Sequence, residues 1–326
     1  MEENKMLEIY KKNNLMSEYS EAVSLLKCIE NKYGDLSNFS PDIIDSVVEE
    51  MIINKANTVD NFVVLMRYYR AVKHDDLFIY LTQYTGMIDV LESILKRTKQ
   101  LIGDEKYKKV FNGFTVPVLG TNPKKLPLYV KDLMKRFNDN FTEKEIKQFL
   151  TGNNHNLSEK SQLREKLEYE NSESFEEYLV GRHKRKVNEL KDYMQNNQIW
   201  FEQKITQEVI NYVEGNQEIL SGKLINDKLY ITKIPYDTNA FINAFDPIEK
   251  RYYACHCPFV RESIISRSDD IDEKFCYCSA GFAKFPFEVI LNQKLGIKCI
   301  ETVLGGSEIC RFEIDMSNVD YKRKKS

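Results

Sequence analysis

The sequence predicts an α+β protein, with an all-helical N-terminal region at residues 1–215 and a C-terminal domain at residues 216–318 that carries a mostly antiparallel sheet. Apolar residues recur at the spacing of amphipathic helices throughout the first region. After Gly215 they alternate with polar residues, as they do in strands. The remaining residues, 319–326, are basic and are expected to form a flexible tail.

Start and stop signals divide the helical region. Ser40 and Thr58 precede apolar runs as N-caps, and Gly86 and Gly103 follow such runs as C-caps. Prolines and glycines gather at residues 117–127, which indicates a loop and a subdivision of the region there.

Two further helices are expected before Gly215, where the helical spacing of apolar residues gives way to strand alternation. A long charged helix begins near Ser174 and breaks at Asn196 and Asn197. After the break, the segment "WFEQKITQEVINYV" is expected to continue as a helix. This places the helical region next to the first strand of the C-terminal domain.

Two hairpins are expected in the C-terminal domain. One turns at Asn226-Asp227 within "GKLINDKLYITKI", and the other turns at Gly305-Gly306 within "IKCIETVLGGSEICRFEI". Between them, "KRYYACHC" is predicted to be a strand and "PFVRESII" a short helix. The segment "SAGFAKFPFEVILNQKLG" is predicted to be a helix that ends at Gly296.

Composition narrows the class of protein. Its 42% hydrophobic and 30% charged residues are typical of a globular chain, and its formal net charge of −3 gives no basic field for nucleic acid. No run of about 18 apolar residues could span a membrane, and the N-terminus lacks the apolar core of a signal peptide. We therefore expect a cytoplasmic protein that binds neither nucleic acid nor membrane. Its expected partners are a small molecule and, as a homodimer, a second copy of the chain.

Several catalytic motifs are missing. The chain has no G-x-x-x-x-G-K-[ST] phosphate loop, no G-x-G-x-x-G dinucleotide loop, no H-E-x-x-H zinc motif and no G-x-S-x-G serine motif. Their absence argues against nucleotide hydrolysis, hydride transfer, zinc proteolysis and serine esterase chemistry.

Cysteines form the most unusual pattern in the chain. Of seven cysteines, six follow Ala254, and four of those are the pairs Cys255 with Cys257 and Cys276 with Cys278. In a strand, side chains at i and i+2 share a face, so each pair can project together. Two pairs side by side would offer four thiolates to zinc. Familiar zinc knuckles have two residues between cysteines, so the spacing permits this site without requiring it.

Two other interpretations of the cysteines stay open. Cys257 and Cys278 each precede a predicted helix start, where a thiolate is stabilised, and Cys310 is a third candidate nucleophile. His256 or His155 would then act as the base, although strand alternation directs His256 away from its neighbouring cysteines. The alternative without chemistry is that the thiols are small buried hydrophobic groups.

Polar and aromatic residues near the junction of helix and strand are candidates for ligand binding. They would line a cleft if the helical region closes over the C-terminal domain. These candidates are Trp200, Glu202, Gln217, Lys233, Tyr236 and Glu301.

The end of the chain, "FCYCSAGFAKFPFEVILNQKLGIKCIETVLGGSEICRFEI", resembles the close of the 4-vinyl reductase-type small-molecule-binding domain. Its G-x-x-x-C-x-F element is also similar to the tail of bacterial aminothiazoline-carboxylate hydrolase-like proteins. With "GNNHN", "NQEILSG", "TKIPY" and "RYYACHCP", most of the chain resembles an uncharacterised family of clostridial-type bacterial proteins with no assigned activity. The first resemblance is carried by Gly281, Glu288, Cys299, Glu301, Gly305, Gly306, Cys310 and Phe312.

The resemblance implies an α+β domain that binds a hydrophobic or aromatic small molecule as a sensor or accessory module. With zinc at the paired cysteines, this is the function we expect. The alternative is a thiol-dependent hydrolase that uses Cys257, Cys278 or Cys310 as its nucleophile.

Overall fold

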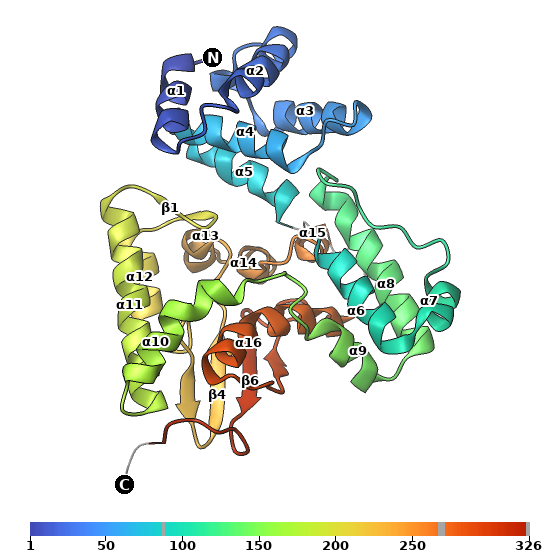
Figure 1. The fold of residues 1–326 in the computed structure, drawn as a ribbon, viewed down its shortest axis with the longest axis vertical. Coiled ribbons are helices and arrows are strands. Elements are labelled where there is room, and N and C mark those ends of the chain that lie inside the picture. Colours follow the sequence, from blue (N-terminus) through green and yellow to red (C-terminus); the bar gives the residue numbers. More distant parts are fainter. Residues whose placement is uncertain (87–88, 267–270, 324–326) are drawn as a thin grey trace. The chain divides into compact units, whose positions relative to one another are not determined.

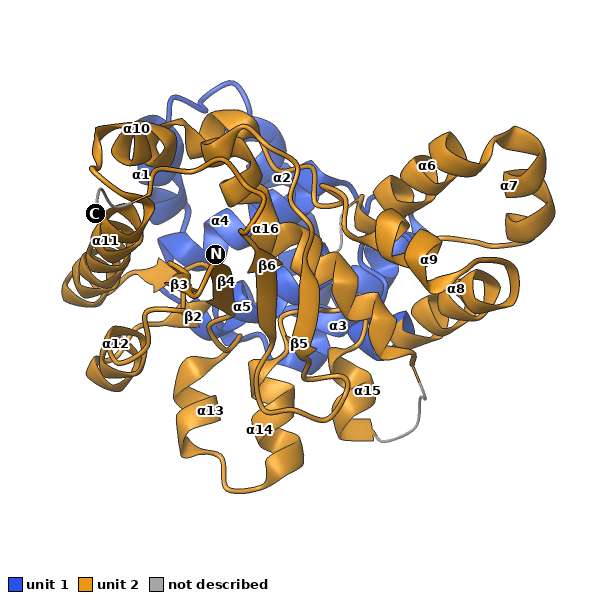
Figure 2. Cartoon of the chain, turned by 90° about the horizontal axis from the view of Figure 1, so that it is seen from below, with its two compact units in different colours: residues 1–88, 117–126 blue, residues 89–116, 127–326 orange. Residues whose placement is uncertain are grey.

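The computed structural model describes residues 1–86, 89–266 and 271–323. It has the predicted α+β architecture, in which a series of helices precedes an antiparallel sheet (Figure 1). The chain divides into two compact units (Figure 2). Unit 1 is Met1–Ile88 with Pro117–Leu126, and unit 2 is Asp89–Val116 with Pro127–Ser326. Residues 324–326 of the predicted basic tail lie outside the described residues.

Unit 1 is a helical bundle with its own core. The side chains of Ser40 and Thr58 accept the backbone N–H groups of Ile43 and Asn61, which confirms both predicted N-caps. The core is rich in aromatic residues, among them the fully buried Phe62. The helices are α1 (Glu3–Lys12), α2 (Tyr19–Tyr33), η1 (Leu36–Asn38), α3 (Pro41–Ile53), α4 (Val59–Ala71) and α5 (Asp75–Thr85).

The segment Pro117–Leu126 completes unit 1. Gly120 has a left-handed φ of +87°, and a Cβ there would lie 3.0 Å from side-chain atoms of both Phe62 and Val48. The Asn57 side chain donates to the carbonyl of Leu119 at 2.8 Å. The loop predicted at residues 117–127 is therefore packed against α3, α4 and the link between them, with a 3-10 turn, η2 (Pro123–Lys125), near its end.

The first part of unit 2 is helical. The capping box of Thr142 and Glu145 and the N-cap Ser174 are present. The long helix ends at Gln195, which confirms the break predicted at Asn196. The elements are α6 (Val90–Ile102), α7 (Asp104–Phe111), α8 (Leu126–Asn140), α9 (Glu143–Leu150), η3 (Glu159–Gln162), α10 (Leu163–Asn171) and α11 (Phe175–Gln195).

A four-stranded antiparallel sheet follows, with the strand order β3-β4-β6-β5. Both predicted pairs of strands are present, and Asn226 and Asp227 adopt the left-handed conformation that a two-residue turn requires. The second pair is joined by residues 302–310, a longer connection than the turn predicted at Gly305-Gly306. The strands are β3 (Lys223–Ile225), β4 (Lys228–Thr232), β5 (Lys298–Glu301) and β6 (Arg311–Asp315).

The second core of the molecule lies between this sheet and helix α16 (Tyr277–Leu291). Phe287 and Ile290 of α16 pack with Leu229 of β4 and Phe312 of β6. Phe175, at the start of α11, belongs to the same core, so helices that precede residue 216 are built into the sheet layer. The remaining helices of unit 2 are α12 (Gln207–Glu214), α13 (Thr238–Asn243), α14 (Pro247–Ala254), α15 (Arg261–Ser266) and η4 (Glu273–Cys276).

Three predictions about local structure were wrong. The expected strand "KRYYACHC" is helix α14 followed by an extended link, because the Asp246 side chain caps the backbone N–H groups of Ile248 and Glu249. The segment around Trp200 forms a hairpin, β1 (Ile199–Trp200) and β2 (Gln203–Lys204), rather than a helix. Helix α16 ends at a left-handed Asn292 and not at Gly296.

None of the helices in the described part of the chain is both long enough and apolar enough to cross a lipid bilayer.

Candidate functional site

Lys233 lies where three segments of unit 2 meet. It follows strand β4, and its backbone N–H donates to the carbonyl of Cys310 at 2.9 Å. Its Nζ donates to the Ser279 hydroxyl at 3.2 Å and lies 5.0 Å from the centre of the Phe282 ring. The ammonium is therefore fixed between the end of β4, the start of β6 and the first turns of α16.

The charge of Lys233 acts on polar side chains that are distant in sequence. It opposes protonation of His155 and His256, and it favours the thiolate forms of Cys257 and Cys278. We call the side chains gathered here the Lys233 cluster. It consists of His155, Glu202, Lys233, Tyr236, His256, Cys257, Arg261 and Cys278.

Arg261 is the second cation of the cluster and begins helix α15. Its side chain is only 5% exposed. The guanidinium lies over two aromatic rings, with its Cζ 4.0 Å from the centre of Tyr236 and 5.5 Å from that of Tyr252. Within the described residues, its Nε has no hydrogen-bond partner. Arg261 is thus a buried cation held mainly by aromatic rings.

Glu202 is the carboxylate of the cluster. It lies in the turn of the β1–β2 hairpin, directly after Phe201, whose φ is +51°. Burial raises the pKa of Glu202, and the positive charges of Arg261 and Lys233 only partly oppose this effect.

His256 is a neutral ring inside the cluster. Its Nε2 donates to the carbonyl of Ile234, and its ring meets Tyr236 edge-on with centroids 5.7 Å apart. Burial lowers its pKa to about 3, and Lys233 adds to this shift. The strand alternation used to orient His256 does not apply, because the residues around it are not a strand. Its orientation is set instead by the bond to Ile234.

Cys278 and His155 bring a thiol and an imidazole into contact within the cluster. The Sγ of Cys278 lies 3.6 Å from Nε2 of His155, and the His155 ring meets Phe282 edge-on at 5.0 Å. Burial raises the pKa of Cys278 to about 12 and lowers that of His155 to about 4. Both groups are therefore neutral at pH 7, as a thiol and an imidazole.

Cys257 occupies the link between α14 and α15. Its carbonyl accepts the backbone N–H groups of Val260 at 3.2 Å and Arg261 at 2.9 Å. Burial raises the pKa of its thiol to about 12, although backbone N–H groups of Phe259 and Val260 favour the thiolate. Cys257 is thus at the start of a helical turn, as predicted, but as a protonated thiol.

Cys255, Cys276 and Cys310 lie near the cluster. Cys255 and Cys276 are buried, and burial raises the pKa of both thiols. Cys310 accepts the backbone N–H of Val303 at its Sγ, at 3.5 Å. The predicted pairing by strand alternation was wrong, because Cys276 ends a 3-10 turn and Cys278 lies in helix α16. In the part of the chain that is described, no three His, Cys, Asp or Glu side chains are grouped to hold a metal ion.

Three of the predicted ligand-binding residues lie outside the cluster. Trp200 packs in a hydrophobic core, where its indole N–H donates to Glu189 at 2.8 Å. The Gln217 side chain donates to the carbonyl of Gly222 at 3.2 Å, within its own loop. Glu301 of β5 lies opposite Arg311 of β6 in the antiparallel sheet. The structure therefore brings Glu202, Lys233 and Tyr236 together and places these three elsewhere.

Sequence reasoning missed several members of the site. Tyr252, Ser279 and Phe282 surround the two cations, although each resembles an ordinary helical residue in the sequence. Asn154 was detectable, since it adjoins His155 in a loop rich in amides. Its buried side chain holds that loop by donating to the carbonyl of Leu150 at 2.7 Å.

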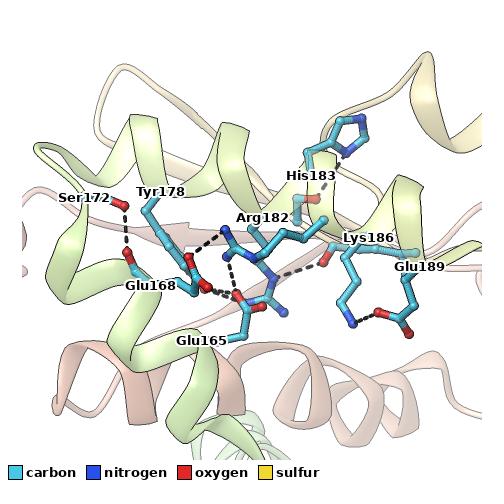
Figure 3. A network of polar contacts seen from close by, with 11 residues as sticks. Glu165, Glu168, Ser172, Tyr178, Arg182, His183, Lys186 and Glu189 are labelled. Carbon is cyan, nitrogen blue, oxygen red and sulfur yellow. Dashed lines mark hydrogen bonds and ion pairs between the residues drawn. The ribbon is translucent and has the colours of Figure 1, made fainter.

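A second polar network, between α10 and α11, provides a comparison (Figure 3). Its centre is Arg182, which is 8% exposed and donates to Tyr178 Oη at 3.1 Å and to the carbonyl of Leu220 at 3.2 Å. Tyr178 donates in turn to Glu165 at 3.0 Å. His183 contacts the Ser221 hydroxyl at 3.2 Å. These groups satisfy one another, so this network joins two helices and is not a candidate site.

Comparisons of the chain with models of protein families, with curated proteins and with solved structures find no match.

Proposed function

We propose that the protein is a cytosolic small-molecule-binding protein, a sensor or accessory module, whose binding site is the Lys233 cluster. The observation that carries this proposal is the gathering of polar side chains from separate segments around one ammonium group. Clusters of titratable groups with shifted pKa values are typical of functional sites. The resemblance of the chain's end to a small-molecule-binding domain points the same way.

The degree of burial of these residues also favours a binding site. His155, Lys233, Tyr236, His256 and Cys257 are all partly exposed, although they adjoin fully buried core residues. Polar and aromatic groups that remain partly open to solvent beside an apolar core are typical of small-molecule sites. A ligand could therefore contact these five side chains without unfolding of the core, whereas Arg261 and Cys278 are only 5% exposed.

A thermal-shift screen of the full chain tests this proposal. We expect some compounds in a broad panel of aromatic, apolar and charged molecules to raise the melting temperature by several °C, as ligands do when they bind only the folded state. Lys233→Met should remove the response. Lys298→Met is the control, because Lys298 is 63% exposed on strand β5. The proposal is contradicted if no compound of the panel raises the melting temperature of the wild type more than that of Lys233→Met.

The second candidate function is a thiol-dependent hydrolase, and the contact between Cys278 and His155 favours it. Such an enzyme needs a thiolate that reacts far faster than the other cysteines near neutral pH. In the resting state, burial instead keeps the Cys278 thiol protonated. Alkylation with iodoacetamide separates the two cases. Cys28, which is exposed, is expected to react first in a binding protein, and Cys278 in an enzyme.

Zinc at Cys255, Cys257, Cys276 and Cys278 remains a prediction from the sequence. These thiols are close enough to influence one another electrostatically, as Cys276 does with Cys255 and Cys257. Metal analysis of protein purified without added zinc is the test. Bound zinc well below one equivalent would remove this part of the proposal.

A further inference from the structure

Two buried arginines of unit 2 differ in their surroundings. Arg182 donates two hydrogen bonds and belongs to a network that ends on the carboxylate of Glu165. Arg261 is slightly more buried, yet its Nε has no hydrogen-bond partner among the described residues, and none of their carboxylates forms an ion pair with it. Among the described residues, the guanidinium therefore belongs to a network that ends on a carboxylate at position 182 and lacks a paired carboxylate at position 261.

The described residues around Arg261 do not supply a paired carboxylate. Tyr236 and Tyr252 present ring faces to it, and the Tyr252 hydroxyl donates to Glu262 at 2.8 Å. Lys233 adds a second positive charge, and its Nζ donates to a hydroxyl, that of Ser279. Glu202 is the carboxylate on which both cations act, and its burial favours the neutral acid. The cluster therefore holds more positive than negative charge.

A buried charge without a partner is unfavourable, and an anion at this point would offset that cost. Guanidinium groups suit the task because their donors match the paired oxygens of carboxylates and phosphates. The Nε that lacks a partner belongs to this set of donors. Nearby aromatic rings, Tyr236 and Phe282, could contact a planar body attached to the anion.

We propose that Arg261 binds the oxyanion group, a carboxylate or a phosphate, of an aromatic or planar small molecule, with Lys233 as the second cation. This inference rests on the proposed function, because it specifies the ligand class of the same site. It assigns to Arg261 the recognition of charge and to Tyr236 and Phe282 the contact with the body of the ligand.

The test uses the full chain and three matched probes: benzoate, phenyl phosphate and the neutral benzyl alcohol. Thermal shift and calorimetric titration are measured for the wild type and for Arg261→Met. We expect benzoate, phenyl phosphate or both to bind the wild type more tightly than benzyl alcohol does, and Arg261→Met to weaken that binding at least about tenfold. Which of the two anions binds better identifies the oxyanion.

Arg182→Met is the matched control, because it removes a buried arginine outside the site. It should leave anion binding unchanged and lower the melting temperature, since it leaves hydrogen-bond acceptors unsatisfied. Without anions, Arg261→Met should melt no lower than the wild type, because it removes an uncompensated buried charge. Arg261→Lys, which keeps the charge but not the paired donors, replaces Arg261→Met should that variant fail to fold.

Two results overturn the inference. One is an anion that binds Arg261→Met as tightly as it binds the wild type. The other is a wild type that binds neither anion more tightly than it binds benzyl alcohol. If neutral compounds still bind through Lys233 in that case, the binding function stands and only the anion class fails. If no compound of the broad panel binds, both proposals fail.

Discussion

His155 and His256 are kept as neutral rings in the folded protein. Burial lowers their pKa values from 6.5 to about 4 and about 3. In the unfolded chain both rings take up a proton near pH 6.5. Because the unfolded state then binds more protons than the folded state, stability falls as the pH is lowered from about 7 toward 4.

The two histidines therefore predict a measurable acid sensitivity of unit 2. The free energy of unfolding should decrease by up to about 1.4 kcal/mol per pH unit for each ring between pH 6.5 and 4. Urea unfolding at pH 7.5, 6 and 5 measures this slope. His155→Asn should reduce it, whereas His74→Asn, in unit 1, should not change the transition of unit 2. An unchanged slope in His155→Asn would contradict the assigned burial.

At the scale of single residues, the sequence predicted the site only in part. Lys233 and Tyr236 were identifiable because they follow a clear strand, at the edge of the expected cleft. The lack of a hydrogen-bond partner at the Arg261 Nε was not predictable. A missing hydrogen bond depends on every neighbouring side chain, and these come from segments distant in the sequence.

Strands β4 and β6 are joined to the preceding loop by an ion pair between the buried Glu218 and the partly exposed Arg311. Glu218 accepts bonds from Arg311 at 2.7 and 2.8 Å and from the Thr232 hydroxyl at 2.7 Å. Burial acts to raise the pKa of Glu218, but the bonds from Arg311 and Thr232 lower it overall. The carboxylate is thus ionised, and it accepts hydrogen bonds from both β4 and β6.

Glu218→Gln should destabilise unit 2 by about 1–3 kcal/mol, because it removes the charge-assisted bonds that Glu218 accepts from Arg311. The control is Glu308→Gln, which removes a more exposed ion pair with Lys250 and should cost less than about 1 kcal/mol. Urea unfolding followed by the fluorescence of Trp200 measures both variants. Equal effects would show that the Glu218 pair contributes no more than a surface pair.

Gly281 sets the distance between helix α16 and the loop that leads to His155. A Cβ at this position would lie 2.7 Å from the carbonyl oxygen of Gly152 and 2.9 Å from the carbonyl carbon of Thr151. Backbone atoms cannot rotate away as a side chain can. The glycine is therefore required by close packing.

Gly281→Ala is expected to destabilise unit 2 by about 1–3 kcal/mol, despite the helical preference of alanine. Gly181→Ala in α11 is the matched control, because its Cβ would meet only the flexible end of Arg185 at 3.2 Å. That substitution should stabilise the protein by about 0.5–1 kcal/mol. Stabilisation by both variants would mean that the loop moves freely away from α16.

Elements were predictable where local signals were strong. The hairpin at Asn226-Asp227 and the capped helices follow from residues adjacent in the sequence. The segments around the paired cysteines were not predictable, because their tyrosines favour strands on average. The side chains of Asp246 and Asp272 accept backbone N–H groups as N-caps, and both segments form helical turns. The error mattered, since the proposed zinc geometry depended on extended chain at both pairs.

The whole molecule contains two units with separate cores, and its single tryptophan reports on one of them. Trp200 lies in unit 2, whereas circular dichroism detects the helices of both units. The two signals therefore need not change together on unfolding.

Phe62→Ala tests the independence of the units. It removes a fully buried ring from the core of unit 1 and should cost that unit about 3–5 kcal/mol. We expect the circular dichroism transition to shift to lower urea, with a much smaller shift of the Trp200 fluorescence. Coincident shifts of both signals would show that the chain unfolds as one cooperative structure.

The interleaving of the two units imposes an order on protein synthesis. The ribosome completes Met1–Ile88 first, then makes Asp89–Val116 of unit 2, and only afterwards delivers Pro117–Leu126 to unit 1. Until then, Val48 and Phe62 lack the loop that packs on them through Gly120. The core of unit 1 therefore stays incomplete while residues 89–116, which belong to unit 2, leave the ribosomal exit tunnel. A gene fragment that stops at residue 88 accordingly encodes a helical bundle with one side of its core left open.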